Sequence, residues 1–441
     1  MKYFGTDGFR GRANETLRLE HAVKIGEYLG RYFAKTQKTP RIVIGKDTRR
    51  SSYMLEYGLA AGIASAGGDA YLLHVITTPG VSYVVKNDGF DCGVMITASH
   101  NPYYDNGIKI LNSNGDKMGD EFLSGIEDYL DGKIELTKAE EPGNCIDYLV
   151  GRSRYINYLT SIPKNPFRGY KVGIDCANGA SFAIARNVFS MLGADIFIIG
   201  NHPDGKNINV DCGSTHVEAL QQFVKDNELD IGFAFDGDAD RCIMVNEKGE
   251  VVDGDGILYI IGLYLKEQGE LNKDTIVATV MSNLGLIRAL DNHGIRLACT
   301  DVGDKYVAQE MFSNNYVIGG EQSGHIILGN YANTGDGILT AIMVMDIMAE
   351  TKNLSSAMTA GLTILPQKIK NIKVEDKNAI MSNEGLLAFV DKVNEEFNGK
   401  GRLLLRASGT EPKVRIMVEA ATEEECDDCI EKTAKEIEKL I

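Results

Sequence analysis

The segment Arg41-Ile42-Val43-Ile44-Gly45-Lys46-Asp47-Thr48-Arg49 is a short apolar run of strand-forming residues that ends in a polar turn. Apolar residues with helical spacing follow over residues 54–66, and a second apolar run lies at residues 70–73. Together they form a strand, loop, helix, strand unit. Because a helix that crosses between two strands of one sheet makes those strands parallel, the unit predicts a parallel pair in an α/β fold.

The same unit recurs twice further along the chain, and in every copy a glycine follows the predicted helix. The recurrence is one of pattern, since the side chains differ between the copies. It predicts three related α/β domains with parallel or mixed sheets. The strands of the second and third copies are expected at residues 171–175, 195–199, 275–280 and 295–298.

The length of 441 residues is too great for one hydrophobic core and predicts about three or four domains of ~100–200 residues. The last part of the chain departs from the repeated unit. Its pattern predicts a helix near residues 386–397, strands near 402–406 and 414–419, and a charged helix from Thr422 onward, which together make an α+β domain. From the stretches rich in glycine, proline and charge, the predicted domains are residues 1–155, 156–252, 253–366 and 367–441.

The composition excludes several classes of protein. A formal net charge of -16 at pH 7 argues against nucleic acid or an anionic membrane as the main partner, because both require a basic face. No apolar run approaches the ~20 residues of a membrane span, and the N-terminus lacks the apolar core of a signal peptide, so we expect a cytoplasmic protein. The eight cysteines are expected to be reduced thiols, and Cys426 and Cys429 to be neighbours on a helix face.

A candidate nucleophile follows the apolar run at residues 92–96, in the hexapeptide Thr97-Ala98-Ser99-His100-Asn101-Pro102. The pattern predicts a buried strand that ends in a stiff polar turn. We expect Ser99 to be exposed there, with His100 beside it. On the hexapeptide alone, an ordinary Asn-Pro turn with a solvated serine is the better interpretation.

A candidate metal site is Asp236-Gly237-Asp238-Ala239-Asp240-Arg241, which follows the predicted strand at residues 231–235. Three carboxylates at alternate positions of a loop can turn toward one point, which suits a hard divalent cation such as Mg2+. A calcium loop of the EF-hand type is the rival, since Glu247 falls at its twelfth position. It is rejected because Arg241 stands where glycine is required and because the flanking segments are strands.

Two further loops suit a phosphorylated sugar. The loop at residues 319–325 places Glu321, Ser323 and His325 between glycines, where they could hydrogen-bond to vicinal hydroxyls; a plain glycine-rich turn is about equally compatible with it. The loop at residues 406–415 combines two arginines, two hydroxyls and a glycine, which suits a phosphate. By contrast, residues 200–207 only approximate a nucleotide-binding phosphate loop, because the metal-binding hydroxyl and the following helix are missing, and we interpret them as a surface loop.

With these motifs in this order, the sequence resembles the α-D-phosphohexomutases from Gly5 to Arg415, nearly its whole length. The glucosamine branch of that family is favoured over the mannose and glucose branches, which commonly have methionine in the position of Gln322. The segments that carry this preference are Gly5-Thr6-Asp7-Gly8-Phe9-Arg10-Gly11, Pro203-Asp204-Gly205-Lys206-Asn207-Ile208-Asn209, Cys212-Gly213-Ser214-Thr215-His216 and Glu321-Gln322-Ser323-Gly324-His325.

The resemblance implies a fold of four domains around a central cleft and an activity. Glucosamine 6-phosphate would be converted to glucosamine 1-phosphate, on the route to UDP-N-acetylglucosamine, through a phosphoserine and a sugar 1,6-bisphosphate that also serves as activator. The partner would be a small phosphosugar, with no nucleic acid and no membrane, and the protein a monomer or homodimer. Binding the sugar in two orientations would require a hinge near residues 365–370. A phosphomannomutase/phosphoglucomutase, a non-catalytic sugar-phosphate sensor and a metal-dependent phosphatase remain as alternatives.

The resemblance also implies roles for individual residues. Ser99 would carry the phosphoryl group, and Mg2+ would be held by that phosphate with Asp236, Asp238 and Asp240. Residues that neutralise charge or relay protons at the transferring phosphate would be Arg10, His100, Lys109, Arg241 and His325. The sugar would be held by Glu321, Ser323 and His325, and the phosphate that is not reacting by Arg406, Ser408, Gly409, Thr410 and Arg415.

Overall fold

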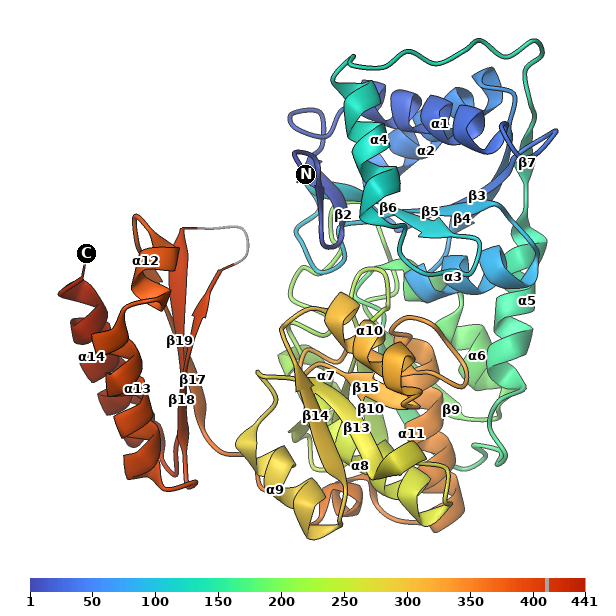
Figure 1. Cartoon of the computed structure of the whole chain (residues 1–441). Coiled ribbons are helices and arrows are strands. Elements are labelled where there is room, and N and C mark those ends of the chain that lie inside the picture. The colour runs from blue at the N-terminus through green and yellow to red at the C-terminus, as the bar shows by residue number, and fades with distance from the viewer. Residues whose placement is uncertain (409–411, 441) are drawn as a thin grey trace. The chain divides into compact units, whose positions relative to one another are not determined.

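A computed structural model describes residues 1–408 and 412–440 (Figure 1). Within these residues the strands form four β-sheets. By compactness the chain divides into one unit of residues 1–280 and 297–360 and a second unit of residues 281–296 and 361–441. The first unit holds three of the sheets and the second unit holds the fourth.

The N-terminal sheet has seven strands in the order β1-β2-β6-β5-β3-β4-β7. The central strand β3 pairs in parallel with β4 and with β5, as the first sequence unit predicts, whereas β6 is antiparallel to β5 and β2. The elements are β1 (Phe4–Gly5), β2 (Gly8–Arg12), α1 (Leu19–Phe33), β3 (Arg41–Lys46), α2 (Arg50–Ser65), β4 (Asp69–Val75), α3 (Thr78–Asn87), β5 (Cys92–Ile96), β6 (Asp105–Asn112), α4 (Asp120–Leu130), β7 (Cys145–Asp147) and α5 (Leu149–Thr160).

Alternation along β3 explains why helices cover both faces of this sheet. Ile42 and Ile44 belong to the core that contains the buried residues of α1 and α2, and Val43 belongs to the opposite core with α3. Successive side chains of a strand point to opposite faces, so a run of apolar residues without polar interruption is buried on both. The polar turn after β3 is thereby placed at the end of the sheet where the site is found.

The second sheet has the order β12-β11-β10-β8-β9, with β8 parallel to both β9 and β10. This is the second predicted unit, although its regular helix begins only after a short 3-10 turn, η1. Strand β11 returns antiparallel to β10, so the loop between them lies at the carboxyl end of β10. The elements are β8 (Lys171–Asp175), η1 (Ala180–Ala183), α6 (Ala185–Met191), β9 (Asp195–Ile199), α7 (Glu218–Asp226), β10 (Ile231–Phe235), β11 (Cys242–Asn246) and β12 (Val251–Val252).

The third sheet has the order β14-β13-β15-β16, so the two strands of the third predicted unit are neighbours. Helix α11 is buried along most of its length, which explains its apolar composition. Even so, the described residues contain no helix with both the length and the apolar character that crossing a membrane requires. The elements are α8 (Gly254–Glu267), η2 (Asn272–Asp274), β13 (Thr275–Thr279), α9 (Leu284–Asn292), β14 (Arg296–Thr300), α10 (Asp304–Asn314), β15 (Ile318–Gly320), β16 (Ile326–Leu328), α11 (Gly337–Thr351) and η3 (Ser355–Thr359).

The C-terminal sheet is antiparallel in the order β17-β19-β18, with α13 and α14 packed against it (Figure 1), and it forms the predicted α+β domain. Cys426 and Cys429 are both buried on α14, and all eight cysteines are free, as predicted. The hinge near residues 365–370 stays a prediction; β17 begins within that range, at Gln367, and is hydrogen-bonded to β19. The elements are β17 (Gln367–Lys373), α12 (Lys377–Met381), α13 (Glu384–Phe397), β18 (Arg402–Ala407), β19 (Lys413–Glu419) and α14 (Glu423–Glu438).

Candidate active site

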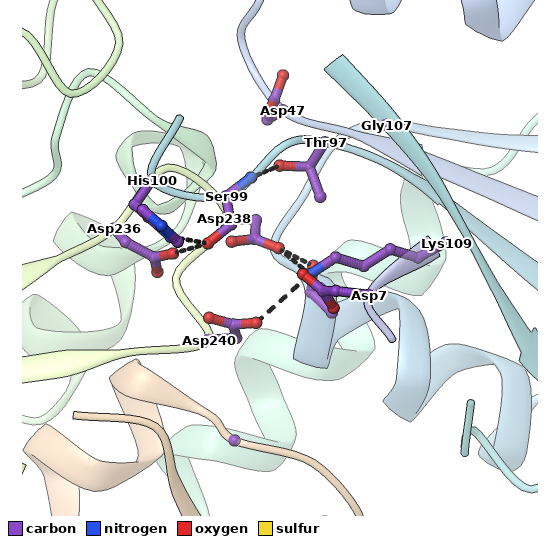
Figure 2. Close-up of polar contacts among 12 residues, drawn as sticks. Asp7, Asp47, Thr97, Ser99, His100, Gly107, Lys109, Asp236, Asp238 and Asp240 are labelled. Atoms are coloured by element: carbon purple, nitrogen blue, oxygen red, sulfur yellow. Dashed lines mark hydrogen bonds and ion pairs between the residues drawn. The ribbon is translucent and has the colours of Figure 1, made fainter. Parts of the chain in front are cut away.

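Ser99 lies in the turn that follows β5, and it is buried, with an exposed fraction of 1%. The expectation of an exposed serine is therefore wrong, because the loop after β10 covers it. Its Oγ donates to Asp236 Oδ2 over 2.5 Å and lies 3.2 Å from Nδ1 of His100 (Figure 2). The backbone N–H of Ser99 donates to Thr97 Oγ1 over 2.9 Å, which closes the turn.

The three carboxylates of the β10–β11 loop meet at one point, as the alternate spacing predicts. Asp236, Asp238 and Asp240 are buried, and one oxygen of each lies within 4.8 Å of the others. Oδ1 of Asp238 and Oδ1 of Asp240 are buried without a hydrogen-bond partner. Burial raises the pKa of Asp236, and repulsion by the other two carboxylates adds to this. Unpartnered oxygens and crowded negative charge both fit a bound divalent cation.

The side chain of Lys109 projects from β6 into this cluster. Its Nζ lies 3.0 Å from Asp238 Oδ2, 3.5 Å from Asp240 Oδ2 and 3.3 Å from Asp7 Oδ1 (Figure 2). Burial alone would lower its pKa, but these carboxylates outweigh burial and raise it well above the usual value. Lys109 is therefore a fixed positive charge beside Ser99.

The other predicted cations and His100 differ in charge. Arg10 forms an ion pair with Asp7, and Arg241 Nε lies 3.9 Å from Asp240 Oδ1. Burial lowers the pKa of His100 to about 4, with Arg241 and Arg10 adding to the effect, so its ring is neutral at pH 7. His100 thus offers a hydrogen bond to Ser99 and no positive charge.

Several functional neighbours were not anticipated from the sequence. Thr78 Oγ1 donates to Asp238 Oδ2 over 2.5 Å from the first residue of α3, and the helix-start pattern Thr77-Thr78-Pro79 is the signal that could have indicated it. Lys117 Nζ bridges Asp7 Oδ1 at 3.1 Å and Asp304 Oδ2 at 2.7 Å, and no local pattern predicts this pairing.

The predicted sugar loop connects β15 to β16. Glu321 is half-buried and its Oε1 accepts a hydrogen bond from the Gly303 N–H over 3.1 Å, whereas Ser323 is exposed. The loop is anchored at Gly324, whose φ is +89° and whose Cβ, if it had one, would lie 2.3 Å from the carbonyl oxygen of Cys242. Glycine is therefore required there for both reasons.

His325 ends the sugar loop and is buried against Asp240, with 3.8 Å between Nδ1 and Asp240 Oδ2. Burial lowers its pKa, yet Asp240 and Asp304 outweigh burial and raise it to about 9, whereas the Gly335 N–H donates to Nε2 over 3.1 Å. The two carboxylates thus favour an imidazolium, but an imidazolium would carry a proton on Nε2 that meets that N–H. The hydrogen bond is the more direct constraint and indicates a neutral ring with its proton on Nδ1, toward Asp240.

A cavity of about 690 Å³ adjoins the centre and is lined at one end by Lys109, Asp240 and His325. This volume lies within the range of small-molecule sites in proteins. Its lining combines lysines such as Lys86 and Lys117 with carboxylates and apolar side chains, and its size admits a small-molecule ligand.

The predicted phosphate loop lies in the second unit, between β18 and β19. Arg406 and Arg415 are directly opposite in the antiparallel register, and Ser408 is buried with its N–H donated to the Lys413 carbonyl over 2.9 Å. Gly409 and Thr410, the other two residues predicted here, lie outside the described residues.

Models of the four domains of one protein family match most of the chain, in order along the sequence. The matched domains are described as phosphoglucomutase/phosphomannomutase alpha/beta/alpha domain I (residues 1–136), alpha/beta/alpha domain II (residues 153–249), alpha/beta/alpha domain III (residues 253–363) and C-terminal domain (residues 369–436). The chain belongs to the phosphoglucomutase/phosphomannomutase family. The resemblance inferred from the motifs is thereby confirmed.

Members of this family can be compared over almost the full length. A phosphoglucosamine mutase of Lachnospira eligens is 52% identical over 436 residues, which cover 98% of this chain and 97% of that protein. One of Lachnoclostridium phytofermentans is 53% identical over 428 residues, which cover 96% and 95%. A solved phosphoglucomutase/phosphomannomutase family protein of Burkholderia thailandensis has a TM-score of 0.82, covering 99% of this chain and 97% of that one, at 22% identity. That likeness shows the four-domain family fold.

Proposed function

We propose that this chain is a phosphoglucosamine mutase, which interconverts glucosamine 6-phosphate and glucosamine 1-phosphate. The observation that carries the proposal is the 2.5 Å contact between Ser99 Oγ and Asp236, within a cluster of three buried carboxylates. A serine hydroxyl at a divalent-metal site, surrounded by cations, is suited to holding and transferring a phosphoryl group. The glucosamine substrate is supported by relatives that are 52% and 53% identical over nearly the whole chain and are named for it.

In the proposed reaction Ser99 begins as a phosphoserine. The bond between phosphorus and Ser99 Oγ breaks, a bond to the C1 hydroxyl oxygen of glucosamine 6-phosphate forms, and the hydroxyl proton ends on Ser99. The resulting 1,6-bisphosphate turns over in the site. The bond between phosphorus and O6 then breaks, the 6-phosphoryl group is transferred to Ser99 Oγ, and the Ser99 proton ends on O6. Glucosamine 1-phosphate is released and the phosphoserine is restored. Added sugar 1,6-bisphosphate activates the enzyme by phosphorylating Ser99.

The proposed roles at the transferring group follow from position. Asp236, Asp238 and Asp240, with the phosphate on Ser99, would hold Mg2+, which when bound neutralises charge on that phosphate. Arg10, Lys109 and Arg241 stabilise the charge that develops on the phosphoryl oxygens, and His100 and His325 orient or relay protons. Lys109 suits this role because it stays protonated among its carboxylate partners.

Binding of the sugar is proposed for the loops of the third and fourth domains. Glu321 accepts hydrogen bonds from the sugar hydroxyls and Ser323 donates to or accepts from them, with His325 beside them. The phosphate that is not reacting is held by Arg406, Ser408, Gly409, Thr410 and Arg415. The domain limits that we propose, residues 1–155, 156–252, 253–366 and 367–441, are supported by the finding that each range holds one sheet of the described chain.

The test is a substrate panel with purified protein, Mg2+ and a sugar 1,6-bisphosphate, together with intact mass before and after incubation. Glucosamine 6-phosphate is expected to be converted with the highest kcat/KM, and one phosphoryl group to appear on the wild type and not on Ser99→Ala. Faster conversion of glucose or mannose phosphates would identify a phosphoglucomutase/phosphomannomutase instead. Continuous phosphate release at a rate comparable to isomerisation would indicate a phosphatase, and a protein without phosphoserine or turnover would be a sensor.

A further inference from the structure

The segment of residues 207–214, the 207–214 loop below, follows the predicted surface loop of residues 200–207 and is itself partly buried. Ile208 is buried with an exposed fraction of 1% and Asn209 with 8%. Its backbone is fixed to the ends of two strands of the second sheet: Gly213 N–H donates to Asp175 Oδ2 over 2.7 Å, and Ser214 N–H donates to the Phe235 carbonyl over 2.8 Å. The loop is therefore a rigid part of the domain that carries the three carboxylates.

From this loop, the side chain of Asn209 reaches into the first domain. Its Nδ2 donates to the backbone carbonyl of Ser99 over 2.9 Å and to that of Asn101 over 3.1 Å. Nη2 of Arg49 donates to the same two carbonyls, over 3.1 Å and 2.5 Å. Two donors, one from each domain, thus hold the carbonyls on both sides of His100.

The first of these donors, Arg49, is itself fixed. It is fully buried, and it forms an ion pair with Asp47 at the end of β3. Asp47 also accepts hydrogen bonds from the Arg49 N–H over 2.9 Å and from Ser52 Oγ over 2.8 Å. A buried guanidinium with these partners has little freedom to move, so the position of the Ser99 carbonyl is set from the first domain by a rigid group.

The backbone of the Ser99 turn has an intrinsically unfavourable conformation. Ser99 has φ +50°, in the left-handed region that side chains other than glycine rarely adopt, and Asn209 has φ +59°. Gly237 lies against both: a Cβ there would be 2.4 Å from the Ser99 carbonyl oxygen and 3.2 Å from Asn209 Nδ2. The close approach of the two loops therefore depends on glycine between two of the carboxylates, and the left-handed Ser99 depends on donors for its carbonyl.

We propose that Asn209 is a positioning residue for Ser99: with Arg49 it holds the Ser99 and Asn101 carbonyls so that Ser99 Oγ faces the three carboxylates. This inference rests on the proposed function, because the direction of Ser99 Oγ matters only if that oxygen carries the phosphoryl group. Both hydrogen bonds that Asn209 Nδ2 donates go to backbone carbonyls and none goes to Ser99 Oγ or to the carboxylates. Asn209 therefore acts through the backbone of the Ser99 turn.

Two variants of Asn209 test the proposal. Asn209→Asp keeps the shape of the side chain and its tolerance of the left-handed conformation, but it places an acceptor oxygen against two carbonyl oxygens. Asn209→Gly removes the donor without imposing charge and also permits a positive φ. The matched control is Asp211→Asn, in the same loop, since Asp211 has φ +51° and an exposed side chain.

For both Asn209 variants we expect kcat to fall by about 10- to 100-fold, as for other small displacements of a reacting group. KM for glucosamine 6-phosphate should change by less than about twofold, since the sugar and the distal phosphate are bound elsewhere. Phosphorylation of Ser99 by a sugar 1,6-bisphosphate, followed by intact mass, should slow by the same factor as kcat. The kinetics of Asp211→Asn should match the wild type, and Asn209→Gly should remain fully folded at the assay temperature, as judged by its thermal unfolding midpoint.

The outcomes separate this inference from the proposed function. If the wild type turns over the phosphosugar and Asn209→Gly has the same kcat and the same rate of Ser99 phosphorylation, the positioning role is overturned and the proposed function stands. A fall in kcat that is fully accounted for by the fraction of each variant that is unfolded at the assay temperature overturns it as well, because it indicates a merely structural residue. A wild type that gains no phosphate on Ser99 and turns over no phosphosugar overturns the proposed function, and the inference with it.

Discussion

At the scale of single residues, the centre is held together by opposite charges, of which Lys109, Asp238 and Asp240 are buried. Asp238 and Asp240 share Lys109, and Asp7 links Lys109 to Lys117. Oxygen atoms of Asp238 and Asp240 still remain without partners. A buried polar atom without a partner is costly, and so is a carboxylate crowded by others, so the centre is electrostatically incomplete until a cation is bound.

The variant Asp238→Asn tests this incompleteness. Its amide oxygen can keep the bonds from Thr78 and Lys109 at Oδ2, while the position of the unpartnered Oδ1 loses its charge. Mg2+ at about 100 times its Kd should stabilise the wild type by about 2.7 kcal/mol, and this gain should largely disappear in the variant. Thermal unfolding with EDTA and with Mg2+ measures this gain.

In EDTA the Asp238→Asn variant should be at least as stable as the wild type. A metal-free variant that is less stable than the metal-free wild type would contradict the repulsion argument.

A second residue-scale prediction concerns Asp7→Asn. The wild-type carboxylate accepts contacts from Lys109 at 3.3 Å and Lys117 at 3.1 Å and pairs with Arg10, so the amide would leave three cations less well held. We expect kcat for the proposed reaction to fall by about tenfold or more, because misplaced catalytic groups are costly. Asp120→Asn is the control, since Asp120 pairs with Lys305 at the surface. Equal activity of the two variants would show that Asp7 positions nothing.

At the scale of elements, α11 begins with a buried carboxyl whose charge depends on pH. Asp336 caps the helix by accepting from the Leu339 N–H over 3.0 Å, and it accepts from the Tyr155 hydroxyl over 2.6 Å. Burial raises its pKa from the ordinary 3.8 to about 6, although these hydrogen bonds lower it. The folded protein therefore binds this proton more tightly than the unfolded chain does.

The consequence for stability has a definite sign. The stabilisation from protonated Asp336 is complete below pH 3.8 and is lost as the pH rises through about 6. Between about pH 5 and 7.5 the wild type should lose roughly 1 to 1.5 kcal/mol relative to Asp336→Asn, which also caps a helix well. Denaturant unfolding of both proteins at the two pH values measures the difference. Parallel pH dependence in the two proteins would refute the raised pKa.

At the scale of the whole molecule, the C-terminal part has a core of its own. The buried apolar residues that pack together there all lie between Val374 and Ile437, on the antiparallel sheet and its helices. A self-contained core of this kind can support independent folding. Glu419, buried in the same sheet, is paired with Arg402 from the neighbouring strand.

We therefore predict that residues 361–441, expressed alone, fold. A dispersed amide NMR spectrum and a cooperative thermal transition are the expected results. Arg402→Met should destabilise the fragment by about 3 kcal/mol or more, because it leaves the buried Glu419 carboxylate unpaired. Exposed Lys392→Met is the control, since its pair with Glu396 lies at the surface. A fragment without dispersion would mean that this core needs the rest of the chain.

Much of the fold could be predicted because local sequence patterns determine it. The repeated strand, loop, helix, strand units became β3 to β4 and β8 to β9, since alternating or continuous apolar residues act within a few positions. The last helix, predicted from Thr422 onward, begins at Glu423, because Thr422 caps it with a hydroxyl that accepts from the Glu425 N–H. Strand β17 was missed because its mixed sequence Gln-Lys-Ile-Lys-Asn-Ile-Lys is partly exposed at a sheet edge, and pairing with β19 decides it.

The sequence by itself determined the family, the chemical character of each loop and the point of convergence of Asp236, Asp238 and Asp240, because these follow from residue types at fixed local spacing. Only the tertiary structure decided that Ser99 is buried against Asp236, 137 positions away, and that Asn209 and Arg49 hold its carbonyl. Contacts of this kind depend on where sheet ends meet. A hydrogen bond between distant loops leaves no periodicity in the chain, so its partners become visible only once the strands that carry them are packed.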